Sequence, residues 1–199
     1  MNIWAVGRNY RDHARELGNE VPKLPMIFLK SGSSLVHGQV CELWEGSLDI
    51  HHEIEIALRF AGAPKAKDLH FDAAALALDL TARDHQAKLK AQGHPWTLAK
   101  SFRGSCPIGD FVEIPANVPH FEFEFSVNGE VRQHGSTKDM VFDFDVLRRY
   151  VLENFPVEPG DLLLTGTPAG VSRLNKGDRA QAWFRSEGGH EARQSWTFR

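Results

Sequence analysis

The segment from His51 to Leu58 contains the residues whose types and spacing most directly suggest chemistry. Glu53 and Glu55 are separated by one apolar residue, and apolar side chains continue to alternate through Leu58. A period of two predicts a strand, on which both carboxylates point to one face, about 6–7 Å apart. Two such carboxylates repel each other unless one keeps its proton or a cation lies between them. Hard ions such as Mg²⁺ and Mn²⁺ prefer oxygen ligands, so the pair could bind such an ion. The alternative to a metal site is that the two glutamates lie on the solvated face of an edge strand.

A third carboxylate, Asp79, interrupts the apolar run 77–80, which we interpret as a buried strand. Burial of a lone charge is costly, so Asp79 is expected to have a strong partner. Either a basic side chain or a metal ion would serve. Lys100, in the segment 96–104, is a candidate for a cation held near the acidic residues, and a surface position is its alternative.

His13 and Glu16 are three residues apart on a short polar helix predicted for residues 10–17, with Asn9 as its N-cap. A glutamate beside a histidine can fix the imidazole tautomer and raise its basicity, which suits a general base. An exposed pair of little energetic value is the alternative. The helix has few apolar residues, so we expect it to be loosely held.

Arg83 and Gln86 share one face of a helix predicted for residues 82–92, whose start is marked by Thr81 and Asp84. Farther along, the segment 165–170 is rich in glycine and threonine. Backbone NH groups in such a loop can approach a ligand closely, so a carboxylate could bind there. The loop is not a phosphate-binding P-loop, because no Gly-Lys-Ser/Thr follows it.

The elements that must position these residues are mostly strands. Further strands are predicted at 2–6, 26–30, 35–40, 121–127, from 131, 162–164, 180–185 and 194–198, and further helices at 72–76 and 144–154. Asn128-Gly129 is the strongest hairpin signal in the chain. Many strands with a few short helices indicate a β-rich α+β fold.

The composition excludes several classes of protein. The chain has 199 residues, enough for one sizeable core, so a single domain over residues 1–199 is expected. The formal charge is −3 and no basic block occurs, which argues against a nucleic-acid partner. No apolar run is long enough to span a membrane. Cys41 and Cys106 form neither a disulfide framework nor a metal-finger spacing, so we expect a reducing cytoplasm.

An ordered set of short motifs resembles the fumarylacetoacetate hydrolase family, and most closely its short acylpyruvase branch. The motifs are Gly7-Arg8-Asn9-Tyr10, His13 with Glu16, Phe28-Leu29-Lys30, His52-Glu53-x-Glu55, Asp79-Leu80-Thr81-Ala82-Arg83-Asp84, Gly93-x-Pro95-Trp96-x-x-Ala99-Lys100-Ser101-Phe102, Pro107, Val127-Asn128-Gly129 and Gly166-Thr167-Pro168-x-Gly170-Val171. No single motif is decisive, but their order and spacing are specific and cover most of the chain.

The resemblance implies a metal site. Glu53, Glu55 and Asp79 match the family's three carboxylate ligands to Mg²⁺ or Mn²⁺. Lys100 matches the active-site lysine beside them. The family fold is a β-roll built on a mixed, mostly antiparallel sheet, and its members are typically homodimers.

The resemblance also implies roles around the metal. Arg83 and Gln86 match positions that help to bind the carboxylate end of the substrate, and Thr167 matches a threonine at the site. His13 and Glu16 match a water-activating pair on a short N-terminal lid. One departure is the segment Ser31-Gly32, where many relatives have proline, which leaves substrate size or loop rigidity open.

The implied activity is metal-dependent hydrolysis of a C–C bond. A 2,4-diketo acid, such as fumarylpyruvate or acetylpyruvate, would give pyruvate and a carboxylic acid. Loss of CO₂ from oxaloacetate and enol–keto tautomerisation pass through the same enolate, so an oxaloacetate decarboxylase or tautomerase is an alternative. The presence of both His13 and Glu16 favours hydrolysis, because only hydrolysis needs an activated water.

Three other interpretations remain open. The first is an isomerase or decarboxylase of an aromatic meta-cleavage pathway, which uses the same fold and ligands. The second is a non-catalytic protein, against which the intact set of carboxylates and Lys100 argues. The third is a zinc or iron site made by His51, His52 and Glu53. It is disfavoured because adjacent residues of a strand point to opposite faces.

Overall fold

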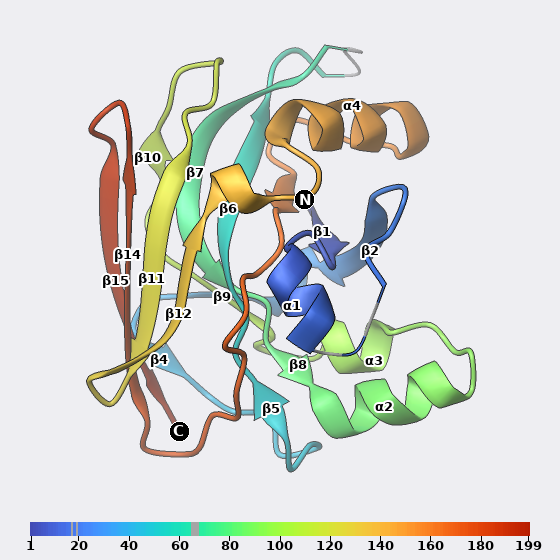
Figure 1. Ribbon diagram of the computed structural model, residues 1–199, viewed down its shortest axis with the longest axis vertical. Helices are drawn as coiled ribbons and strands as arrows, with labels where there is room; N and C mark the ends of the chain where they lie inside the picture. The colour runs from blue at the N-terminus through green and yellow to red at the C-terminus, as the bar shows by residue number, and fades with distance from the viewer. Residues whose placement is uncertain (17, 19, 65–67) are drawn as a thin grey trace.

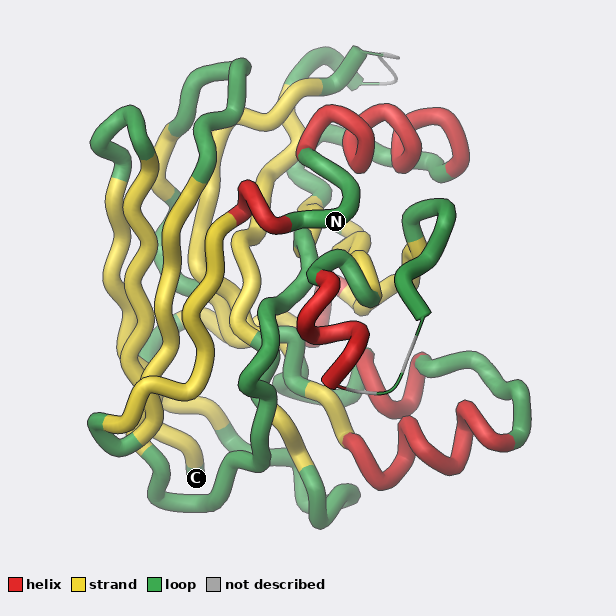
Figure 2. The backbone as a smooth tube through the Cα atoms, in the orientation of Figure 1, coloured by secondary structure: helices red, strands yellow, loops and turns green. Residues whose placement is uncertain are grey.

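A computed structural model describes residues 1–16, 18, 20–64 and 68–199, and two sheets dominate it (Figures 1 and 2). In spatial order the larger sheet contains β2 (Met26–Ser31), β1 (Asn2–Gly7), β13 (Leu162–Leu164), β6 (Ile54–Ala61), β7 (His70–Leu78), β9 (Cys106–Ile108) and β3 (Leu35–His37), with β10 (Val112–Glu113) paired to β7. The smaller sheet contains β12 (Glu130–Ser136), β11 (Phe121–Val127), β14 (Arg179–Ser186), β15 (Glu191–Phe198) and β4 (Val40–Cys41). A short pair joins β5 (Ile50–His51) to β8 (Thr81–Ala82).

The helices gather on the side of the molecule away from the smaller sheet (Figure 1). They are α1 (Arg11–Glu16), α2 (Arg83–Ala91), α3 (Thr97–Lys100) and α4 (Phe144–Asn154), with 3₁₀ turns at Gly32–Ser34 and Thr137–Asp139. None of the helices in the described part of the chain is long and apolar enough to cross a membrane.

The main core lies between the two sheets. On β6, the side chains of Ile54, Ile56 and Leu58 are buried in the same apolar cluster as Phe123 and Phe125 of β11. The alternate residues of β6 face the other way, where Ala57 joins a second, smaller cluster. The alternation read from the sequence therefore places Glu55 on the face of β6 opposite the main core.

The mixed, mostly antiparallel β-roll is confirmed. Among the strands of the described residues, three pairs are parallel, namely β1 with β13, β3 with β9 and β15 with β4. The predicted hairpin is also present, since Asn128 and Gly129 join β11 to β12 with φ angles of 53° and 82°. Positive φ at both positions is what a tight type I′ hairpin turn requires.

The helix predicted for residues 72–76 is wrong, because these residues belong to β7. The segment is rich in alanine and leucine, which favour helices in isolation. Here β7 lies inside the larger sheet with β6 on one side and β9 and β10 on the other, and Ala73, Ala74 and Ala75 are completely buried. Tertiary packing outweighs the local preference, and the small side chains suit a strand covered on both faces. The strand predicted for 35–40 is divided between β3 and β4.

Two predicted helix caps are also wrong. Asn9 does not cap α1: its side-chain amide donates to the carbonyl oxygens of Phe142 and Thr165, and its amide oxygen accepts from Phe142 N. At α2 the cap residue is Ala82, without a side-chain hydrogen bond. Leu17, the last residue of the predicted first helix, lies outside the described residues.

The start of the chain is held by a buried carboxylate, Asp161, which immediately precedes β13. It is 1% exposed and accepts hydrogen bonds from the backbone N of Asn2 at 2.6 Å, from Trp4 Nε1 at 3.1 Å and from Glu158 N at 3.2 Å. These bonds fix β1 beside β13.

We expect Asp161→Ala to lower the free energy of unfolding by about 2–4 kcal/mol, because it leaves several buried donors unsatisfied. Urea denaturation followed by circular dichroism measures the change. A suitable control is Asp145→Ala, since that side chain is 86% exposed and should change stability by about 0.5 kcal/mol or less. Equal effects of the two substitutions would contradict the structural role of Asp161.

Candidate active site

Three buried carboxylates meet at one end of β6 and β7. Glu53, Glu55 and Asp79 have ligand oxygens within 4.8 Å of one another. The pairing of the two strands explains this arrangement: Ile54 lies opposite Leu78, and Asp79 N donates to Glu53 O at 2.9 Å. The expectation that the two glutamates share a face and meet Asp79 agrees with this geometry.

Two buried lysines compensate part of this charge. Lys100 Nζ, on α3, lies 2.8 Å from Glu53 Oε2 and 2.5 Å from Asp79 Oδ2. Lys30 Nζ, on β2, lies 2.7 Å from Asp79 Oδ1 and also donates to the main-chain oxygen of Lys100. Asp79 therefore has basic side chains as partners, as one of the two expectations required. The interpretation of Lys100 as a surface residue is wrong.

Glu55 is the carboxylate that these cations leave unpaired. It is 1% exposed, and Oε2 accepts a hydrogen bond from Gly166 N at 2.6 Å. Within the described residues it forms no ion pair. Burial, together with the charges of Asp79 and Glu53, raises the pKa of the Glu55 carboxyl well above its usual value.

The charged forms of Glu53 and Lys100 are favoured instead. Burial alone would raise the pKa of Glu53, but the cations Lys100 and Arg83 outweigh it, so the net pKa lies below the usual value. Burial would likewise lower the pKa of Lys100, but Asp79 and Glu53 raise it overall, so its ammonium form is favoured. The site thus combines a stable cation at Lys100, an ionised carboxylate at Glu53, and one carboxyl, that of Glu55, which lacks a cation.

A divalent metal ion fits this donor set. The three carboxylates supply only oxygen ligands, lie close together and are buried, as hard cations require. A cation beside Glu55 would also neutralise the charge that the lysines leave uncompensated. Glu53, Glu55 and Asp79 are therefore the residues that could hold Mg²⁺ or Mn²⁺.

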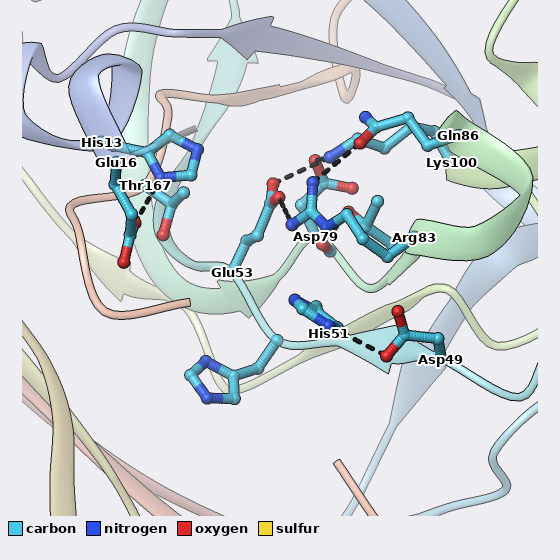
Figure 3. Close-up of polar contacts among 12 residues, drawn as sticks. His13, Glu16, Asp49, His51, Glu53, Asp79, Arg83, Gln86, Lys100 and Thr167 are labelled. Carbon is cyan, nitrogen blue, oxygen red and sulfur yellow. Dashed lines mark hydrogen bonds and ion pairs between the residues drawn. The ribbon is translucent and has the colours of Figure 1, made fainter. Parts of the chain in front are cut away.

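Arg83 and Gln86 lie on the same face of α2, as predicted, and point toward the carboxylates (Figure 3). Arg83 Nη1 donates to Gln86 Oε1 at 2.8 Å, and Nη2 donates to Glu53 Oε1 at 2.5 Å. The buried Nε of Arg83 has no hydrogen-bond partner among the described residues. This pair can present NH groups to an anion that enters beside Glu53.

His13 and Glu16 come together on α1. His13 Nδ1 lies 3.3 Å from Glu16 Oε2, and His13 is only 5% exposed. The other oxygen of Glu16 accepts a hydrogen bond from Gly170 N at 3.0 Å. This short helix therefore buries the His13 side chain and contacts the segment 165–170 through Glu16, whereas the expectation that it is loosely held stays a prediction.

A cavity of about 190 Å³ connects these groups. Its wall includes every site residue predicted from the sequence except Glu16, namely His13, Glu53, Glu55, Asp79, Arg83, Gln86, Lys100 and Thr167. In Figure 3, His13 and Thr167 lie on one side of Glu53, and Arg83 and Gln86 on the other. The apolar side chains of Met26, Phe28 and Trp96 complete part of the wall. A cavity of this size suits a small acid.

The zinc or iron interpretation is not supported. His52 turns away from the carboxylates, and its ring nitrogens lie 2.8 Å from Gln133 Oε1 and 2.8 Å from Ser172 Oγ. His51 Nε2 instead lies 3.0 Å from Asp49 Oδ1. The two histidines thus diverge, as expected for adjacent residues of a strand.

Sequence reasoning missed two basic residues of the site. Lys30 is completely buried beside Asp79, and the argument applied to Asp79, a charge within an apolar run, would have identified it. Arg8 lines the cavity and has a φ of 58°, which is uncommon outside glycine. Its sequence context gives no signal for this conformation. It forms no hydrogen bond or ion pair with the described residues.

Comparison with known proteins gives consistent matches. A family model described as "Fumarylacetoacetate (FAA) hydrolase C-terminal" matches residues 2–193. The mitochondrial oxaloacetate tautomerase fahd-1 of Caenorhabditis elegans is 42% identical over 185 residues, which are 88% of this chain and 86% of the relative. The mitochondrial oxaloacetate decarboxylase of Dictyostelium discoideum is 41% identical over 186 residues, 88% of this chain and 84% of the relative.

A solved structure is similar over the whole chain. It is fumarylpyruvate hydrolase from Pseudomonas aeruginosa, in complex with Mn²⁺ and pyruvate. The TM-score is 0.88 and the identity is 28%, and the match covers 100% of this chain and 89% of that protein.

The raised pKa of Glu55 leads to a test of the metal site. A divalent ion binds the carboxylate form, so we expect Mg²⁺ binding to release protons and to tighten as the pH rises toward the Glu55 pKa. Calorimetry in buffers of different ionisation enthalpy measures the released protons. At about 100 times its Kd, Mg²⁺ should add ~2.7 kcal/mol to the free energy of unfolding.

The matched control is Glu55→Gln, which keeps the side-chain shape but removes the ionisable ligand. This variant should lose both the proton release and most of the stabilisation. Equal stabilisation of the variant and the wild-type protein would argue against a cation at Glu55.

Proposed function

This chain belongs to the fumarylacetoacetate hydrolase family, and we propose that it is a divalent-metal-dependent enzyme that acts on oxaloacetate as a tautomerase and decarboxylase. The observation that carries the proposal is the cavity wall, on which three buried carboxylates lie beside the ammonium group of Lys100. The names of two relatives, about 40% identical, support oxaloacetate over the acylpyruvates that the sequence favoured.

The chemistry of oxaloacetate matches the charges of the cavity. Tautomerisation and loss of CO₂ both place negative charge on the oxygen of the 2-keto group, which becomes an enolate. Mg²⁺ or Mn²⁺, when bound by the three carboxylates, would stabilise that charge. Lys100 supplies a second, fixed positive charge from a desolvated position, where electrostatic stabilisation is strong. Arg83 and Gln86 would hold the carboxylate next to the keto group.

Arg8 gives this proposal a more specific form. Oxaloacetate has a second carboxylate, and Arg8 is a cavity-lining residue whose side chain forms no hydrogen bond or ion pair with the described residues. Residues in a sparsely populated backbone conformation are retained where the surrounding structure imposes it, often at ligand sites. Asn9 is fixed by three side-chain hydrogen bonds, and so the backbone next to Arg8 is held in place. We assign Arg8 to the distal carboxylate of the substrate.

Hydrolysis of acylpyruvates is the second candidate function, and one observation favours it. His13 lines the cavity and is oriented by Glu16, as a residue that activates water must be. The fumarylpyruvate hydrolase of Pseudomonas aeruginosa, similar in structure, supports this candidate. In a tautomerase the same imidazole would move the proton at C3 of oxaloacetate.

Two further expectations stay predictions. The resemblance to the family implies a homodimer, and the cysteine usage suggested the cytoplasm. The curated relatives from Caenorhabditis elegans and Dictyostelium discoideum are named as mitochondrial proteins.

The proposed function is tested by offering the purified protein oxaloacetate, acetylpyruvate and fumarylpyruvate in parallel, with Mg²⁺ and with EDTA. Enol–keto conversion is followed by the ultraviolet absorbance of the enol, and pyruvate by a coupled assay. We expect metal-dependent turnover of oxaloacetate to exceed that of both diketo acids. Faster cleavage of a diketo acid would move the assignment to the hydrolase.

Substitution of His13 separates the reactions. Decarboxylation needs stabilisation of the enolate, whereas hydrolysis and tautomerisation also need a group that moves a proton. We expect His13→Ala to reduce hydrolysis and tautomerisation by roughly 10²–10⁴-fold and to spare most decarboxylation, as measured by kcat for each reaction. Glu16→Gln should have the same pattern with a smaller effect. Equal loss of all three activities would contradict the role of His13.

Substitution of Arg8 tests the distal subsite. Asparagine tolerates a positive φ, so Arg8→Asn removes the charge without new backbone strain. We expect KM for oxaloacetate to rise roughly 10- to 100-fold, as for loss of a hydrogen bond to a charged group. KM for acetylpyruvate, which has no second carboxylate, should change little and so provides the control.

The same variant should shift the balance between the two oxaloacetate reactions. The distal carboxylate is the group that leaves as CO₂, and an ion pair with Arg8 stabilises it before it leaves. Loss of this ion pair should therefore raise the ratio of decarboxylation to tautomerisation. Equal rises of KM for both substrates would show that Arg8 does not recognise the distal carboxylate.

A further inference from the structure

Gln133 connects its own strand, β12, to the segments 52–54 and 167–168 at the site. It lies on β12 and is 1% exposed. Its amide oxygen accepts hydrogen bonds from Ile54 N at 3.1 Å and from His52 Nδ1 at 2.8 Å. Its amide nitrogen donates to Thr167 Oγ1 at 2.7 Å and to Pro168 O at 2.8 Å. The four bonds use the full capacity of a primary amide.

The surroundings decide which end of this amide is oxygen. Ile54 N can only donate a hydrogen bond, and Pro168 O can only accept one. The amide oxygen of Gln133 must therefore face Ile54, and its nitrogen must face Pro168. A flipped amide would place two donors against each other at one end and two acceptors at the other.

This orientation settles the state of His52 behind the amide. Because the oxygen of Gln133 accepts, His52 Nδ1 must carry the proton, and Nε2 accepts from the hydroxyl of Ser172 at 2.8 Å. The chain from Ser172 through His52 to Gln133 thus has one direction of donation.

The same orientation fixes the hydroxyl of Thr167. Its oxygen accepts from Gln133, so its own proton remains available for another acceptor. The described residues offer that proton no partner, although Thr167 is only 3% exposed. Thr167 lines the cavity on the side of Glu53 where His13 also lies (Figure 3). A molecule bound in the cavity could supply the acceptor that this donor lacks.

We propose that Gln133 is a positioning residue, which holds the Thr167 hydroxyl as a hydrogen-bond donor to a negatively charged oxygen of the bound substrate. This inference rests on the proposed function, because it needs an anionic keto acid in the cavity. Without the hydrogen bond from Gln133, the hydroxyl would be free to rotate. A donor fixed before the substrate arrives requires no reorganisation when the enolate charge develops.

Substitution of both residues tests this coupling. Gln133→Glu keeps the shape and the acceptor for Ile54 and His52, but its ionised side chain accepts from Thr167 instead of donating. Thr167→Val removes the hydroxyl, whereas Thr167→Ser keeps it. The probe is oxalate with Mg²⁺, since oxalate is a planar dianion that chelates divalent ions as an enolate of pyruvate does. Calorimetry measures its affinity, and kcat/KM for oxaloacetate is measured in parallel.

We expect Gln133→Glu and Thr167→Val each to lower oxalate affinity roughly 10- to 100-fold, which is the scale for a hydrogen bond to a charged group. Thr167→Ser should retain most of the affinity. In the Thr167→Val background, Gln133→Glu should have no further effect, because its influence passes through the missing hydroxyl. Gln133→Met is the second variant if the glutamate prevents folding, which circular dichroism and the unfolding midpoint reveal.

Two outcomes would overturn the proposal. One is an equal loss of oxalate affinity from Gln133→Glu with and without the Thr167 hydroxyl, and the other is unchanged affinity in both single variants. Failure of the proposed function is distinguishable from either. In that case the wild-type protein binds oxalate with Mg²⁺, responds to the substitutions as described, and turns over no oxaloacetate.

Discussion

Three carboxylates within 4.8 Å of one another, almost completely shielded from water, are the constraint on which the rest of this structure depends. Coulomb repulsion in such a place is severe unless it is compensated. The compensating cations are Lys30 on β2, Lys100 on α3 and Arg83 at the start of α2, each of which forms an ion pair with Glu53 or Asp79. Elements far apart in sequence are thereby drawn to one end of the β6–β7 pair. Because Glu55 has no cation beside it among the described residues, the cluster could hold a metal ion there.

The strongly patterned parts of the fold could be predicted from the sequence. Alternation on β6 and β11, the hairpin at Asn128-Gly129 and the helix 144–154 follow from local periodicity and turn chemistry. The segment 72–76 was wrongly predicted as a helix, because alanine suits a helix in isolation and a crowded strand in a sheet. Which of the two it forms is decided by β6, β9 and β10, that is, by residues distant in sequence.

The site divides in the same way. The spacing of Glu53 and Glu55 and the isolated charge of Asp79 identified the three carboxylates as candidate site residues. Their convergence follows from the register of β6 on β7. Gln133 had no signal, since a glutamine on a strand gives no indication that both ends of its amide will be used. The preference for hydrolysis relied on His13 and Glu16, which suit more than one reaction. Relatives named for oxaloacetate chemistry shift that balance.

Glu16 uses its two oxygens for different purposes, since one contacts His13 Nδ1 and the other accepts from Gly170 N. Withdrawal of α1 from the segment 165–170 would break the second contact and release the carboxylate that orients the imidazole. Under the proposed function, His13 would therefore be oriented as a base only while α1 contacts the segment 165–170. Such a coupling would link proton transfer to the position of this helix.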